Sequence, residues 1–130
     1  FQADRSARFV KAVREYFRPE FFNRIDVVVP FVSLDREVCH RIIRHELARL
    51  EKREGIAERR LRILPTERLT EHLLALGFDA RYGARPLQRT IESEIVPALA
   101  RMLLEHPDLG DSALSIDWDT ESNCTRIDIG

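Results

Sequence analysis

The spacing of the apolar residues changes near Gly110, and this change restricts the possible folds more than any other feature of the chain. Over residues 87–99 an apolar residue recurs at every fourth position, which is the period of one face of an α-helix. Over residues 114–118 and 125–129 apolar or β-branched residues alternate with polar ones, as in half-buried strands. Polar residues 119–123 separate these last two segments. We therefore expect a helix followed by a β-hairpin.

Two further helices are expected before this long helix. The first has Ser33 as its N-cap and is expected to end at Gly55, and the second occupies residues 65–77 and ends at a glycine. Pro97 lies inside the long helix, where it removes one backbone donor, so we expect a kink or break near Val96. The apolar stripe of the first helix consists of Cys39, Ile43, Leu47 and Leu50.

Residues 60–64 alternate charged and apolar side chains and are expected to form a third strand. These segments together predict an α+β fold, with helices packed on one face of a small three-stranded sheet. The N-terminal part predicts a helix over residues 3–17, a short helical turn over residues 20–23 and a β-branched strand over residues 25–29. Because the composition shifts after this strand, we expect a boundary near Val32 between a piece of another domain and the compact unit.

The overall charge and the cysteines exclude several classes of protein. The 21 basic and 22 acidic side chains give a net charge of -1, so no overall field favours nucleic acid or an anionic membrane. The apolar runs are far shorter than the roughly 20 residues needed to span a bilayer. Cys39 and Cys124 lie far apart and the N-terminus does not resemble a secretion signal, so we expect two reduced thiols and a cytoplasmic protein.

No metal site is expected from the histidines. His40 and His45 are five positions apart, which does not place both on one face of a helix, as the zinc-binding pair of a metalloprotease helix requires. His72 is distant in sequence, and no third ligand completes a set with the other two histidines. We expect all three to be solvated or capping residues.

Two arginines are expected at the ends of helices, where the planar, permanently charged guanidinium group is suited to bind phosphate oxygens. Arg24 follows the short helical turn, and its alternative role is an ordinary surface salt bridge. Arg85 follows Gly83 and Ala84 and directly precedes Pro86, where the long helix is expected to begin, so free backbone N–H groups there also favour an anion. The alternative for Gly83, Ala84 and Arg85 is a turn that has only a structural role.

Both arginines lie in motifs that resemble those of the Clp-type AAA+ ATPases, a family of disaggregases and unfoldases. The run FRPEFFNRID at residues 17–26 resembles the end of the family's large ATP-binding subdomain, and GFDARYGARPL at residues 77–87 contains a run similar to its sensor-2 motif. The resemblance implies that residues 1–32 are a C-terminal remnant of the large subdomain. Residues 33–130 would then form the C-terminal small subdomain, or lid.

The resemblance also implies roles for these residues. Arg24 would be an arginine finger that reaches the γ-phosphate of ATP held by the neighbouring subunit, and such a finger can accelerate turnover by about 10³ to 10⁵. Arg85, with Gly83 and Ala84, would contact the nucleotide of its own subunit and report its state by moving the small subdomain. Members of the family use ATP and Mg²⁺ and form hexameric rings that act on unfolded or aggregated proteins, with a peptidase or a co-chaperone as a further partner.

The chain lacks the parts that such an ATPase needs to hold nucleotide. The sequence contains neither a GxxxxGK[ST] phosphate loop nor an apolar strand ending in paired acidic residues for magnesium. We therefore expect no ATP hydrolysis and no tightly bound cofactor from these residues alone, and we interpret the chain, which starts at Phe1 inside an expected helix, as a fragment. Its role would be to couple nucleotide state to movement between subunits, with the sheet edge and the hairpin over residues 114–129 as expected contact surfaces, which replacement of Trp118 by a charged residue would test.

A non-catalytic helical adaptor or a nucleic-acid-binding module is the alternative function. Basic residues gather at positions 59–62 and along the helix that carries Arg41 and Arg49, and a stripe that bound phosphates would show salt-dependent affinity. Glutamates lie between these basic residues and favour a salt-bridged surface, so we expect no nucleic-acid partner. Within the family, the residues leave open whether the longer protein is a disaggregase or an unfoldase that feeds a peptidase.

Overall fold

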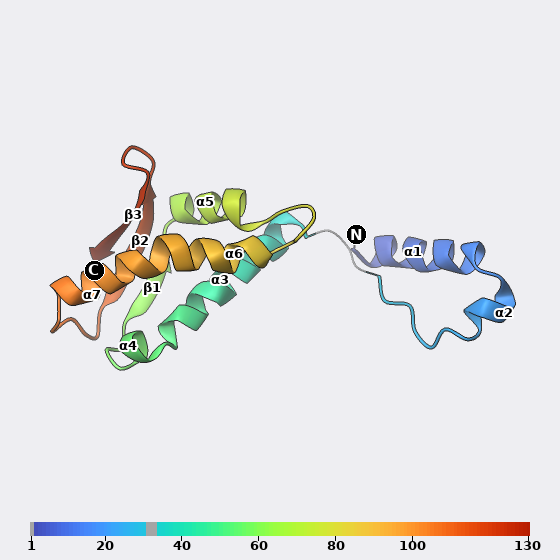
Figure 1. Cartoon of the computed structure of the whole chain (residues 1–130), viewed down its shortest axis with the longest axis horizontal. Coiled ribbons are helices and arrows are strands. Elements are labelled where there is room, and N and C mark those ends of the chain that lie inside the picture. Colours follow the sequence, from blue (N-terminus) through green and yellow to red (C-terminus); the bar gives the residue numbers. More distant parts are fainter. Residues whose placement is uncertain (1, 31–33) are drawn as a thin grey trace. The chain divides into compact units, whose positions relative to one another are not determined.

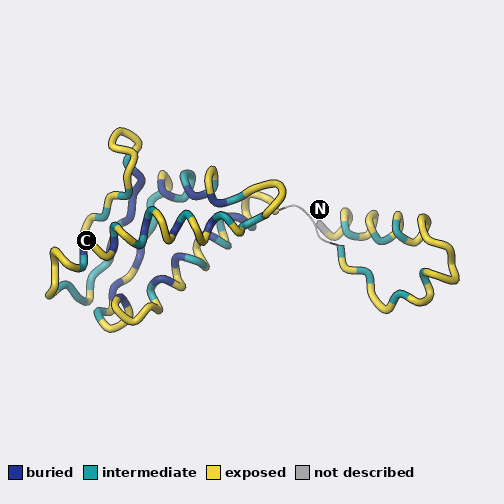
Figure 2. Tube along the Cα trace, in the orientation of Figure 1, coloured by how far each residue is buried: buried dark blue, intermediate teal, exposed yellow. Residues whose placement is uncertain are grey.

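The computed structural model describes residues 2–30 and 34–130 and shows an α+β protein, as the sequence predicts (Figure 1). The chain divides into two compact units, Phe1–Leu34 and Asp35–Gly130. The second unit contains all three strands and all the buried residues of the described chain. The burial pattern in Figure 2 shows this difference along the chain, because buried segments occur only within the second unit.

The first unit contains two helices, and none of its residues at positions 3–30 is buried. Helix α1 spans Gln2–Tyr16, and helix α2 spans Pro19–Phe22 and begins with a proline, as expected. The rings of Phe17 and Phe21 lie 4.9 Å apart, yet both residues are exposed. The prediction of a strand over residues 25–29 is wrong. A strand needs a neighbour to bind its backbone groups, and the described residues of this unit provide none.

Helix α3 spans Arg36–Glu51 and buries its predicted apolar stripe. Its N-cap is Asp35, whose side chain accepts a hydrogen bond of 2.8 Å from the backbone N–H of Val38. The prediction that Ser33 caps this helix is therefore wrong, and Ser33 itself lies outside the described residues. The prediction that Gly55 ends α3 is also wrong. The chain already turns at Lys52, which has ordinary helical angles, and Gly55 lies in the short helix α4, Glu54–Ala57.

Helix α5 spans Glu67–Gly77, with the side chain of Thr66 as its N-cap. The long helix is formed by α6, Arg85–Thr90, the π-helical turn η1, Ile91–Ile95, and α7, Val96–Glu105, in direct succession. Near Val96, where a kink or break was predicted, the helix continues through a π-helical turn. The N–H of Val96 donates to the carbonyl of Ile91, five residues back. This wider turn directly before Pro97 provides room for a ring that would collide with the preceding turn of a regular α-helix.

The sheet contains strands β1, Arg62–Pro65, β2, Ala113–Asp119, and β3, Cys124–Ile129, in that spatial order. Strands β1 and β2 are parallel, and β2 and β3 form the predicted antiparallel hairpin, with Ile116 opposite Ile127. Helices α5 and α7 pack against this sheet, in agreement with the predicted layering (Figure 1).

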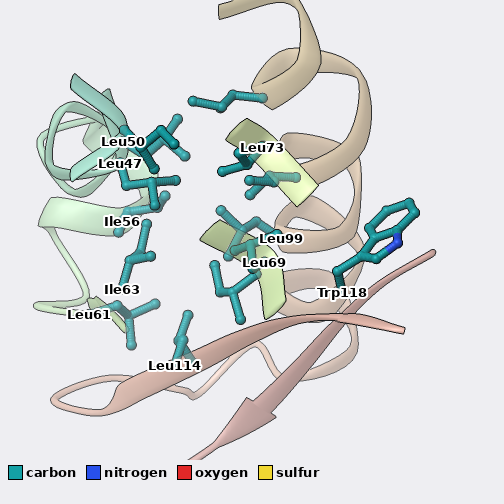
Figure 3. Close-up of a cluster of buried hydrophobic side chains, with 14 of the residues drawn as sticks. Leu47, Leu50, Ile56, Leu61, Ile63, Leu69, Leu73, Leu99, Leu114 and Trp118 are labelled. Carbon is teal, nitrogen blue, oxygen red and sulfur yellow. The ribbon is translucent and has the colours of Figure 1, made fainter. Parts of the chain in front are cut away.

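The core lies between α3, α5, the long helix and the sheet. In Figure 3, Leu47 and Leu50 of α3 face Leu69 and Leu73 of α5 across this core. Trp118 belongs to the same cluster and is only 7% exposed, because its indole stacks on an imidazole ring. Trp118 is therefore a core residue, and the hairpin as a contact surface stays a prediction.

Candidate functional site

The residues that precede the long helix form a tightly bonded turn. The backbone groups of Asp79 and Gly83 bind each other through two hydrogen bonds of 2.9 and 2.8 Å. The Oδ1 atom of Asp79 also accepts hydrogen bonds from the backbone N–H groups of Arg81 and Tyr82. Gly83 has φ 63°, a left-handed conformation that a residue with a side chain adopts at a cost. The sequence-based expectation of a left-handed or tight backbone at this glycine is therefore confirmed.

The turn is fixed on its other side by close packing between α5 and α6. Gly77 is buried at the end of α5, and a Cβ atom added to it would lie 2.8 Å from Cδ1 and 3.3 Å from Cα of Leu87. Leu87 is itself fully buried, two residues after Arg85. The start of α6 is thus held against α5 by a contact that only glycine permits, and the position of Arg85 depends on this contact.

Arg85 is the first residue of α6, and its side chain is exposed. It lines a surface hollow of about 280 Å³ together with Ala84, Ile42, Glu46 and Gln88. The Glu46 carboxylate already accepts hydrogen bonds from Arg49 at 3.3 Å and from Gln88 at 3.5 Å. Among the described residues, no hydrogen bond or ion pair involves the Arg85 guanidinium group. The structure thus brings Gly83, Ala84 and Arg85 together and leaves one cation available to an external anion.

Arg24 belongs to the first unit, directly after α2. Its backbone N–H donates to the carbonyl of Phe21 at 3.0 Å, which fixes the turn, and its side chain is exposed. The ordinary salt bridge that was its alternative role is not formed with Asp26 or with any other described residue. Arg24 therefore also presents a guanidinium group to solvent.

Three of the basic residues that prompted the nucleic-acid hypothesis, Arg49, Arg59 and Arg60, are engaged within the chain. Arg59 donates to the carbonyl oxygens of His106 and Pro107 at 3.2 and 2.9 Å, and Arg60 pairs with Asp111 at 2.7 Å. The Arg53 guanidinium group binds Glu92 and holds the pKa of that carboxyl below its usual range. These contacts hold Arg53, Arg59 and Arg60 within the chain, which weakens the nucleic-acid hypothesis.

Sequence reasoning missed two polar clusters that join the sheet to the helices. Asp117 is buried in β2 and accepts hydrogen bonds from the Thr66 hydroxyl and from Arg68, and these partners hold the pKa of its carboxyl below the usual range. An acidic residue between two apolar residues of a strand is the signal that could have revealed it.

The second cluster is centred on His72. Its ring stacks on the indole of Trp118, with centroids 3.6 Å apart and planes 9° from parallel, and its Nε2 atom lies 2.7 Å from Oε2 of Glu94. His72 is therefore a packed residue that connects α5 to the π-helical turn, not the solvated or capping residue that was expected. No group of three potential metal ligands occurs among the residues at positions 2–30 and 34–130.

Comparison with known proteins identifies this arrangement. Residues 34–113 match the family model described as the C-terminal, D2-small domain, of ClpB protein. The chain is 42% identical over 110 residues to chaperone protein ClpB3, chloroplastic, of Arabidopsis thaliana, which covers 85% of this chain and 11% of that protein. It is 37% identical over 112 residues to chaperone protein ClpB of Gloeobacter violaceus, covering 86% of the chain and 13% of the relative.

A fungal relative shows similar agreement. Heat shock protein hsp98 of Neurospora crassa is 40% identical over 95 residues, which is 73% of this chain and 10% of that protein. The chain thus spans about a tenth of the length of the curated relatives that it matches. No helix in the described part of the chain is long and apolar enough to cross a membrane.

Proposed function

This chain belongs to the ClpB family of Clp-type AAA+ ATPases and carries their C-terminal D2-small domain, and from this premise we propose that it is the nucleotide-sensing lid of an ATP-dependent disaggregase. In this proposal Arg85 contacts the phosphates of a nucleotide bound by the same subunit. Gly83 and Ala84 supply the backbone that positions it. The lid then converts the presence of those phosphates into movement relative to the neighbouring subunit.

One observation carries this proposal: Arg85 is an exposed arginine without a described partner, fixed at the start of a helix that is anchored by the buried Leu87. A guanidinium group binds phosphate oxygens through charge-assisted hydrogen bonds, which are stronger than neutral ones. The turn at Asp79 and Gly83 and the packing of Leu87 on Gly77 prevent the helix start from shifting independently of the core. A pull on Arg85 would therefore be transmitted to the whole second unit.

The test uses the full-length protein that contains this chain, with Arg85→Ala and Arg85→Lys. We expect the alanine variant to weaken ATP binding about tenfold or more, because a hydrogen bond to a charged group contributes about 1.5 to 3 kcal/mol. The lysine variant keeps the charge but loses the planar fork, so it should recover only part of the affinity. Arg89→Ala is the matched control, because Arg89 is an exposed arginine one turn further along the same helix. Equal ATP affinity in all variants would refute the assignment.

For the first unit we propose that residues 1–32 are the C-terminal remnant of the large ATP-binding subdomain and that Arg24 is a finger acting on the neighbouring subunit's nucleotide. The absence of any buried residue among positions 3–30 supports this, because such a segment would find its core in a larger domain. The exposed Arg24 guanidinium group, which has no partner in the described part of the chain, supports the catalytic role. Such a group stabilises negative charge on the phosphoryl group during transfer.

Arg24→Ala in the full-length protein tests this second role. We expect turnover to fall by about 10³ or more while ATP affinity and assembly are retained, because a finger acts in the transition state. In mixtures with the wild-type protein, variant subunits should lower the activity more than in proportion to their share, since each finger serves another subunit. Arg18→Ala is the control, an exposed arginine directly before α2. Equal turnover for Arg24→Ala and the wild-type protein would show that Arg24 is structural.

The remaining properties of the longer protein follow from the same proposal. The phosphate loop and the magnesium site would come from residues outside this chain, and bound ATP with Mg²⁺ would supply the phosphoryl group that is transferred. We propose a hexameric ring in which neighbouring subunits are the direct partners, unfolded or aggregated proteins are the substrates, and a co-chaperone or a peptidase is a further partner. The proposed compartment is the cytoplasm, although relatives from Arabidopsis thaliana and Oryza sativa are named chloroplastic.

A further inference from the structure

The outer edge of β3 carries backbone groups without partners among the described residues. The N–H of Gly130 donates to the carbonyl of Ala113, so this pair is of the hydrogen-bonded type. Hydrogen-bonded and non-hydrogen-bonded residue pairs alternate along two antiparallel strands. The backbone groups of residues 124, 126 and 128 therefore also bond to β2. The N–H and C=O groups of Thr125, Ile127 and Ile129 must therefore point away from β2, toward the open edge of the sheet.

The opposite edge of the sheet is protected. The N–H of Leu61 donates to the carbonyl of Ile56, and the N–H of Ile63 donates to Oε1 of Glu51 at 2.6 Å. The next residue that faces outward is Pro65, which has no N–H group. Every outward donor of β1 is thus bound or absent, whereas β3 has no such protection. Proteins usually block their sheet edges, so one open edge beside one blocked edge indicates a surface that pairs with another strand.

A groove beside β3 provides room for such a strand. A hollow of about 350 Å³ lies between α7 and β3, and Ala98 and Met102 of α7 and Ile127 of β3 contribute apolar surface to it. Ile129 is 43% exposed at the same edge. Figure 1 shows β3 as the last strand of the sheet, beside α7. A strand added there would extend the sheet and cover these apolar side chains.

The charges on the other face of β3 determine which strand fits. Arg126 and Asp128 are exposed and two residues apart, so they share this face and their side chains lie 3.5 Å apart. We propose that β3 pairs antiparallel with β3 of a second copy of this chain, centred on Ile127. This register places Arg126 of each strand opposite Asp128 of the other. It also directs the outward groups of residues 125, 127 and 129 toward each other, for about six backbone hydrogen bonds.

The same charges disfavour the neighbouring registers. A slip of two residues in one direction would place Arg126 of one chain opposite Arg126 of the other, and a slip in the opposite direction would do the same for Asp128. Like charges directly opposite each other destabilise a strand pair. The pairing also stops at two chains, because β1 offers no second open edge. The contact is small, so the dimer should be weak and concentration-dependent. The β3 dimer has two-fold symmetry, whereas the proposed contact between neighbouring subunits of a ring does not. A chain that fails to form this dimer would therefore leave the proposed function intact.

Charge reversal tests the proposal on the chain as printed. In sedimentation velocity over about 10 μM to about 1 mM, the range of a weak transient interface, the wild-type chain should shift from monomer to dimer. Arg126→Asp and Asp128→Arg should each raise the dimer dissociation constant at least about tenfold, because every attractive pair becomes repulsive. An equimolar mixture of the two variants should dimerise again, since each supplies the charges that the other lacks. The double variant should also dimerise.

Two results would overturn the proposal. One is a wild-type chain that stays monomeric at the highest concentration. The other is single variants that dimerise as well as the wild type, which would place the interface elsewhere, for example on the exposed aromatic residues of α1 and α2. Both substituted side chains are about two-thirds exposed, so folding should be retained. The fluorescence of Trp118, the one tryptophan of the chain, reports any loss of the core.

Discussion

Gly77→Ala is the substitution for which the structure predicts the clearest effect. The added Cβ would lie 2.8 Å from Cδ1, 3.2 Å from Cβ and 3.3 Å from Cα of Leu87. The Cδ1 atom can move by a change of rotamer, but Cβ and Cα move only with the backbone of α6. Overpacking of this kind costs about 1 to 3 kcal/mol. The higher helix propensity of alanine offsets up to about 1 kcal/mol. With the full offset, we therefore expect a net loss of about 0 to 2 kcal/mol in the free energy of unfolding.

Urea and thermal unfolding of the chain, followed by the fluorescence of Trp118, measure this effect. Trp118 is buried in the second unit, and the first unit has no described buried residue, so the signal reports the second unit. A loss of 1 kcal/mol lowers the melting temperature of a domain of this size by about 4 to 8 °C. Gly55→Ala is the control, because no atom lies within 4 Å of the added Cβ, and it should be neutral or stabilising.

A double-mutant cycle with Leu87→Ala identifies the cause. Truncating Leu87 removes the atom nearest to the new Cβ, so Gly77→Ala should cost less in that background than in the wild type. If Gly77→Ala instead stabilised the wild-type chain as Gly55→Ala does, close packing would not be the reason for a glycine at this position. Because Leu87 lies two residues after Arg85, the full-length Gly77→Ala variant should also bind ATP more weakly.

Two further predictions concern groups whose pKa is shifted. The pKa of Asp117 is lowered in the folded state by the Thr66 hydroxyl and by Arg68, so its contribution to stability is present above the ordinary pKa of an aspartate and is lost as the pH falls through the folded value. The unfolding free energy should therefore decrease more steeply with acid in the wild-type chain than in Asp117→Asn. Burial raises the pKa of the Cys39 thiol, whereas Cys124 is exposed. Ellman's reagent should thus modify one thiol rapidly and the second only at the rate of unfolding, and two rapidly reacting thiols would contradict the described burial.

The helices and the hairpin of the second unit could be predicted because their signals are local. Leu69 and Leu73 are spaced as on one face of a helix, and Leu114 and Ile116 as on one face of a strand. Both faces are buried in the same core within this chain. The prediction of a strand at residues 25–29 was wrong. The β-branched residues there favour an extended strand, but a strand forms only when a partner strand binds its backbone groups. In the full-length protein that partner would belong to the large subdomain.

Other differences arise from competition that the sequence does not resolve. Ser33 and Asp35 are both capping residues, and only the backbone path decides which one lies next to the free N–H groups. The hairpin was expected to be a contact surface because a half-buried strand edge invites pairing, but the stacking of Trp118 on His72 depends on how α5 crosses the sheet. For the site, the sequence indicated Gly83, Ala84 and Arg85 as one group. The role of Gly77 as a packing contact required the distance to Leu87.

The unbroken helical segment from Arg85 to Glu105 has a mechanical consequence. At 1.5 Å per residue it is about 30 Å long, with the proposed sensor at one end and the groove beside β3 near the other. A tilt of only about 5° about the sensor end would displace the far end by about 3 Å, which is comparable to the spacing of one strand residue. The proline in the middle would have placed a hinge in this lever. The π-helical turn carries the helical segment past this proline without a break, so a small displacement at a phosphate group can become a large one at the opposite end of the domain.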